Sequence, residues 1–123
     1  MQLPKKGEII PLEKVKEICL FFHRKELWAR IEADPPTKPA VSDGCSMFPD
    51  IIAAVNIYYL CLLHDLEYWC GGSDIDRLVA DAKLMIGVAR EGIPEIAEMM
   101  FAGVRAGGTD KIKTPWRWGF GRE

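Results

Sequence analysis

The spacing of apolar residues along the chain predicts helices. In the first third, apolar residues recur three and four positions apart, which is the spacing of one face of an α-helix. The first expected helix begins at Pro11, which suits a first turn, and continues past Trp28 to Ile31. It ends at Asp34-Pro35-Pro36, because proline interrupts the helical hydrogen bonds. The other apolar residues of this pattern are Val15, Ile18, Cys19, Phe22 and Leu27.

Three more helices are expected after a loop rich in turn-forming residues. The loop runs from Pro35 to Pro49, and the helices run from Pro49 to Cys70, from Ser73 to Gly92 and from Pro94 to Gly107. Ser73 is a helix-capping residue, and Gly71-Gly72 before it favours a tight turn. No segment shows the alternation of a strand, although a short hairpin in the C-terminal tail stays open. The pattern therefore predicts an all-α fold.

Length and composition are those of one soluble globular domain. The chain has 123 residues, of which 49% are apolar and 28% charged, with a formal net charge of -2. We expect a single domain over residues 1–123 that ends in a basic, aromatic tail over residues 109–123. No apolar run reaches the roughly 18 residues of a membrane span, and a pI near 5.7 argues against nucleic-acid binding. No signal peptide is recognisable, so the chain is expected in the cytoplasm, or outside the cell if its start is trimmed.

Acidic residues concentrate in the middle of the chain. Residues 32–104 contain twelve acids and four bases, a net charge of -8, whereas residues 1–31 and 105–123 each carry +3. Solvated helix faces explain most surpluses of this kind. The surplus also suits a site for a hard cation such as calcium.

One histidine lies among carboxylates on the two central helices. His64 and Tyr68 share a helix face, and Asp65 lies on the adjoining face. A tight turn at Gly71-Gly72 pairs His64 with Asp81, since both are equally far from it. Asp81 interrupts an apolar stripe, and a buried carboxylate needs a partner. The pair serves either to prepare His64 as a general base or simply to hold two helices together.

The loop before the second helix holds a further acid and a cysteine. Four cysteines, Cys19, Cys45, Cys61 and Cys70, admit three pairings. A link between Cys45 and Cys61 would bring Asp43 towards Asp65, and two carboxylates with loop carbonyls are ligands that calcium prefers. Cys61-x-x-His64 with Cys70 is only a loose match to a zinc site, because a fourth ligand is missing.

These segments resemble the phospholipase A2 superfamily, and its bacterial and fungal secreted branch most of all. The matching residues are Asp43-Gly44-Cys45-Ser46, then Cys61-x-x-His64-Asp65-x-x-Tyr68, then Asp81 on the next helix. The match covers residues 43–81, about a third of the chain. The resemblance implies a small helical domain that hydrolyses the sn-2 acyl ester of phospholipids with the help of calcium.

The resemblance also implies a role for each matched residue. His64 becomes the general base that activates water, Asp81 orients it, and Tyr68 binds Asp81. Calcium would be held by the carboxylates of Asp43 and Asp65 and the backbone carbonyl of Gly44. Cys45 and Cys61 become the disulfide of the family, and Cys19 and Cys70 either pair with each other or stay free.

Two other functions compete with this one. A binding module that keeps the phospholipase fold without turnover is the first. The second is a metal phosphohydrolase of the HD type, in which His23 would join His64-Asp65. For partners, we expect a phospholipid or another acyl ester, with peripheral membrane contact through Trp116 and Trp118 if these do not pack on the core, and no nucleic acid.

Overall fold

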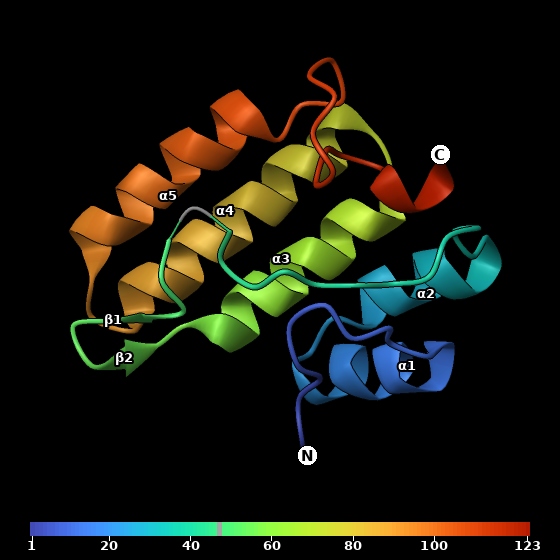
Figure 1. Ribbon diagram of the computed structural model, residues 1–123, viewed down its shortest axis with the longest axis horizontal. Helices are drawn as coiled ribbons and strands as arrows, with labels where there is room; N and C mark the ends of the chain where they lie inside the picture. The colour runs from blue at the N-terminus through green and yellow to red at the C-terminus, as the bar shows by residue number, and fades with distance from the viewer. Residues whose placement is uncertain (47) are drawn as a thin grey trace.

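The computed structural model describes residues 1–46 and 48–123 and is mostly helical within them (Figure 1). The α-helices are α1 (Leu12–Phe21), α2 (Lys25–Ala33), α3 (Tyr58–Cys70), α4 (Asp74–Arg90) and α5 (Pro94–Gly107). A two-stranded antiparallel sheet, β1 (Ile51–Ile52) and β2 (Val55–Asn56), precedes α3, and a 3-10 turn η1 (Phe120–Arg122) ends the chain. The predicted helical fold class is confirmed, with one small sheet added. Within the described part of the chain, no helix combines the length and hydropathy that crossing a membrane requires.

The central helix is α3, which has helices on both sides (Figure 1). Every residue from Leu60 to Cys70 is buried, as expected of a helix that is covered all round. On one side Leu62 and Leu66 pack with residues of α1 and α2. On the other side Leu60 and Cys61 pack with residues of α4 and α5. Side chains of α3 therefore reach both of these hydrophobic clusters.

The C-terminal segment folds back over the end of α3. The backbone N–H of Gly119 donates to the carbonyl of Tyr68 at 2.8 Å, and Trp118 Nε1 donates to the carbonyl of Gly72 at 3.0 Å. Trp118 is buried, whereas Trp116 remains 37% exposed. The two tryptophans thus have different environments: Trp118 packs on the core, and Trp116 is partly exposed to solvent.

The prediction of one helix from Pro11 to Ile31 was wrong. The chain breaks between α1 and α2, where His23 adopts a left-handed conformation with φ of 60°. The N–H of Arg24 donates to the carbonyl of Cys19 at 2.7 Å, and the N–H of His23 lies 3.4 Å from the carbonyl of Leu20. These two bonds form a Schellman motif, which ends α1. Arg24 then lies 3.7 Å from the buried carboxylate of Glu67 on α3.

The expected start of the second long helix at Pro49 was also wrong, because α3 begins at Tyr58. The intervening residues form the β1–β2 hairpin, with Ile52 opposite Val55. The expected loop from Pro35 to Pro49 includes residue 47, which lies outside the described residues. The predictions for the last two helices are confirmed. Ser73 forms a capping box with Asp76 at the start of α4, and Pro94 begins α5.

Candidate functional site

The site is built around His64, which α3 places opposite Asp81 on α4. His64 Nε2 lies 2.8 Å from Asp81 Oδ1, and the Tyr68 hydroxyl donates to the same oxygen at 2.7 Å. The side chain of Asp81 is fully buried. A carboxylate accepts hydrogen bonds, so Nε2 carries the proton in this contact and Nδ1 is left as the basic nitrogen of a neutral ring.

Two arginines complete this cluster, and the sequence analysis missed both. Arg105 on α5 donates from Nη1 to Asp81 Oδ2 at 2.8 Å. Arg77 on α4 donates from Nε to the Tyr68 hydroxyl at 3.1 Å, and from Nη2 to the carbonyls of Val104 and Arg105 at 2.8 Å. A buried carboxylate such as Asp81 indicates that a cation is near, which was the one available signal. The sequence pattern did not show which arginine α5 would bring to it.

The cluster determines the ionisation of Asp81. Burial by itself raises the pKa of Asp81, whereas hydrogen bonds from His64, Tyr68 and Arg105 lower it. The net effect is a pKa below the ordinary value of an aspartate. Burial raises the pKa of Tyr68, and the neighbouring Asp81 charge raises it further, so Tyr68 remains a hydrogen-bond donor. Asp81 therefore stays an anion that accepts bonds from all three neighbours.

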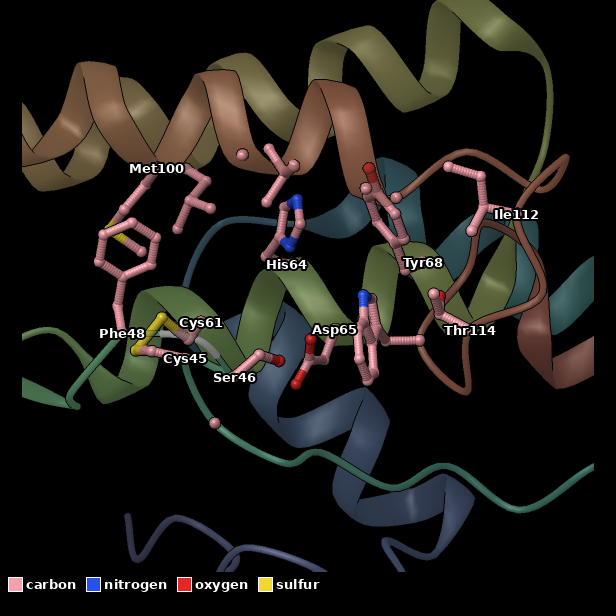
Figure 2. A pocket seen from close by; sticks show the side chains of 17 residues that line it. Cys45, Ser46, Phe48, Cys61, His64, Asp65, Tyr68, Met100, Ile112 and Thr114 are labelled. Carbon is pink, nitrogen blue, oxygen red and sulfur yellow. A yellow bond between two sulfur atoms is a disulfide. The ribbon is translucent and has the colours of Figure 1, made fainter.

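A cavity of about 160 Å³ opens beside His64. Its lining is mostly apolar and includes the side chains of Phe48, Leu84, Met100, Val104, Ile112 and Trp116. Figure 2 shows Phe48 and Met100 at one end and Ile112 and Thr114 at the other, with His64 between them. Asp65 and Tyr68 also line this cavity. The histidine thus stands in a mainly apolar space, of the kind that a small ligand or an acyl chain occupies.

The loop before the hairpin brings Asp43 to Asp65. Both residues line a second cavity, which Trp116 also borders. The Ser42 hydroxyl donates to Asp65 Oδ2 at 2.7 Å and accepts the N–H of Gly44 at 3.1 Å. Burial raises the pKa of Asp65 well above its ordinary value, the Asp43 charge raises it further, and the Ser42 hydrogen bond lowers it. A cation between the two carboxylates would relieve this repulsion.

The donor set fits calcium in chemical type. Asp43 and Asp65 offer the carboxylate oxygens that calcium prefers, out of the roughly six to eight ligands that it takes. Gly44 lines the cavity beside His64 together with Asp65, and its backbone carbonyl is a further oxygen donor. Across residues 1–46 and 48–123, no group of three or more His, Cys, Asp or Glu side chains lies close enough to hold a metal ion. Backbone carbonyls, water and substrate would therefore supply the rest of the shell.

The cysteines divide into one linked pair and two thiols. Cys45 and Cys61 lie at disulfide distance, with their Cα atoms 5.0 Å apart. This link joins the loop of Asp43 to α3, and it leaves Cys61 unable to contribute to a zinc site. Cys19 and Cys70 are free and buried. Burial raises the pKa of the Cys19 thiol to about 12.

His23 lies away from this site. It is exposed at the corner between α1 and α2 and does not line the cavity that contains His64. A phosphohydrolase of the HD type needs the two histidines around one metal, so the arrangement does not favour that alternative.

Comparisons of the chain with protein-family models, with curated proteins and with solved structures gave no match.

Proposed function

We propose that this protein is a calcium-dependent esterase that hydrolyses the sn-2 acyl ester of phospholipids. The observation that carries the proposal is the 2.8 Å contact between His64 and the fully buried Asp81, beside an apolar cavity. A ring held through Nε2 presents Nδ1 as a base, and the apolar lining suits an acyl chain. The resemblance of residues 43–81 to the phospholipase A2 superfamily points to the same chemistry.

The residues of the chain account for the proton transfers. His64 Nδ1 takes a proton from water as the water oxygen bonds to the ester carbonyl carbon. Asp81 stabilises the imidazolium that results, because its charge lies against Nε2. The bond between the carbonyl carbon and the alcohol oxygen then breaks, and the imidazolium returns its proton to that oxygen. The products are a fatty acid and a lysophospholipid.

Asp43, Asp65 and the Gly44 carbonyl would hold the calcium ion. When bound, the ion supplies positive charge near the ester carbonyl, where the oxyanion develops. Tyr68 holds Asp81 in place from the same helix that carries His64. Met100 and Phe48 line the apolar end of the cavity, where an acyl chain would lie.

The decisive experiment removes the proposed base. In mixed micelles of phospholipid and detergent with calcium, His64→Ala should lower the rate of fatty-acid release by about 1,000-fold, a typical contribution of general base catalysis. A phospholipid with two different acyl chains identifies the position that is cleaved. His23→Ala is the matched control, because it removes the other histidine, and its rate should equal that of the wild type. Equal rates for His64→Ala and the wild type would refute the mechanism.

Calcium binding and fatty-acid release, measured together, separate the esterase from the non-catalytic module. Isothermal titration should detect calcium binding by the wild type and a large loss in Asp65→Asn, whereas Asp110→Asn on the exposed surface should bind normally. If the wild type binds calcium and lipid but releases no fatty acid, the protein is a binding module. If rates depend on a transition metal and on His23, the HD alternative is correct.

A further inference from the structure

The two oxygens of Asp81 have different partners. Oδ1 accepts hydrogen bonds from His64 and Tyr68, while Oδ2 accepts one from Arg105 at 2.8 Å. The three partners come from two helices, because His64 and Tyr68 belong to α3 and Arg105 belongs to α5. Rotation of the carboxylate would break at least one of these bonds. Asp81 is therefore held in the orientation that faces His64.

Among the described residues, only the arginines near Asp81 can balance its charge while His64 is neutral. Tyr68 is uncharged, and a neutral imidazole donates a hydrogen bond without a positive charge. Arg77 Nε lies 3.9 Å from Oδ2, but it also donates to Tyr68 at 3.1 Å. Arg105 is the nearer cation, and a guanidinium stays protonated at every physiological pH.

We propose that Arg105 is a positioning residue that keeps Asp81 ionised and oriented towards His64 throughout turnover. The predicted effect of Arg105 on the reaction rate rests on the proposed esterase function. The hydrogen bond between Arg105 and Asp81 does not depend on that function. Arg105 acts through Asp81, because it is not among the residues that line the cavity. It reaches Asp81 from α5.

The structure separates this role from a purely structural one. Arg105 is one-third exposed, and among the described residues its side chain makes a single hydrogen bond, the one to Asp81. The position of α5 is secured by other groups. Arg77 of α4 donates to two backbone carbonyls in the last turn of α5. Ala97 and Met100 of α5 pack in the core that α5 shares with α3 and α4. Loss of the Arg105 side chain should therefore leave α5 in place.

Kinetics of Arg105→Gln test the proposal. Glutamine retains a donor without the charge, so we expect kcat to fall by about 10-fold or more, as for other residues that support a reactive group. KM should stay unchanged, because no contact with the cavity is lost. Arg105→Lys should recover part of the rate, and Arg90→Gln, which removes an exposed charge from α4, should match the wild type. A rise in KM with kcat unchanged would overturn the proposal.

A measurement without turnover keeps the proposal testable if the protein is not an esterase. In ¹⁵N-labelled protein at one fixed pH, the ring N–H proton of His64 gives a low-field signal, assigned by its loss in His64→Ala. Arg105→Gln should shift or broaden this signal, Arg105→Lys should do so less, and Arg90→Gln should leave it unchanged. An identical signal in Arg105→Gln and the wild type would overturn the positioning role. Absence of turnover in the wild type, with the signal displaced in Arg105→Gln, would refute the proposed function alone.

Discussion

The hydroxyl of Thr114 lies in the interior, where polar groups normally form hydrogen bonds. Its Oγ1 is covered from solvent and, among the residues that the structure describes, has no hydrogen-bond partner. A buried hydroxyl without a partner costs about 1–3 kcal/mol of stability. Thr114→Val keeps the shape and removes the hydroxyl, so we expect the free energy of unfolding in urea to rise by about 1 kcal/mol.

Thr109 provides the matched control for this prediction. Its Oγ1 accepts the backbone N–H of Lys111 at 3.3 Å, so Thr109→Val removes a hydroxyl that has a partner. We expect Thr109→Val to lower the free energy of unfolding slightly, opposite to the change in Thr114→Val. Equal losses in both variants would show that the Thr114 hydroxyl is satisfied in solution.

At the residue scale, what the sequence predicts depends on how closely two residues are tied along the chain. The contact between His64 and Asp81 follows from helix periodicity and the short turn at Gly71-Gly72, which together determine the register of α3 against α4. The contact between Asp81 and Arg105 does not follow from the same reasoning. The angle of α5 to α4 depends on side-chain packing, which no simple pattern in the sequence encodes.

At the scale of elements, the break between α1 and α2 places a histidine in a costly conformation. His23 occupies the C′ position of a Schellman motif, where glycine is the usual residue, and its φ is 60°. A left-handed residue with a side chain costs about 1–2 kcal/mol relative to the right-handed form. We expect His23→Gly to raise the free energy of unfolding by about 1 kcal/mol, measured by urea denaturation.

The control for this prediction is His23→Ala, which removes the imidazole but keeps a Cβ. Its stability should remain near that of the wild type, because alanine meets the same backbone restriction. If His23→Ala stabilises the protein as much as His23→Gly, the gain comes from the lost side chain and not from the backbone.

The β1–β2 hairpin shows why one element escaped the sequence analysis. Its two-residue turn, Ala53-Ala54, has φ values of 51° and 66°. Such turns normally contain Asn-Gly or a similar pair, because glycine has no Cβ and asparagine can form local hydrogen bonds, so both tolerate positive φ. Alanine gives no such signal, and two-residue strands are too short to show alternation. By contrast, Ser73 and Pro94 are strong signals, and both helices begin where these residues predict.

At the scale of the whole molecule, one helix connects the two larger hydrophobic clusters and the site. Residues of α3 face α1 and α2 on one side and α4 and α5 on the other, and the same helix carries His64, Asp65 and Tyr68. Most residues from Leu60 to Cys70 are apolar, and this feature of the sequence agrees with the central position of α3. The closure of the C-terminal segment over α3 had no comparable signal, because it depends on single bonds such as that from Gly119 to Tyr68.

The link between Cys45 and Cys61 joins the loop of Asp43 to α3, and it encloses 16 positions of the chain. Closing a loop of this size stabilises a protein by about 3 kcal/mol in the chain-entropy description. We expect the double variant Cys45→Ala/Cys61→Ala to lose about that much free energy of unfolding and to bind calcium more weakly, because Asp43 is no longer tied to Asp65. Dithiothreitol should lower the stability of the wild type to that of the double variant and leave the double variant unchanged. A further loss in the double variant on reduction would instead show that Cys19 and Cys70, which are free thiols in the structure, form a disulfide in solution.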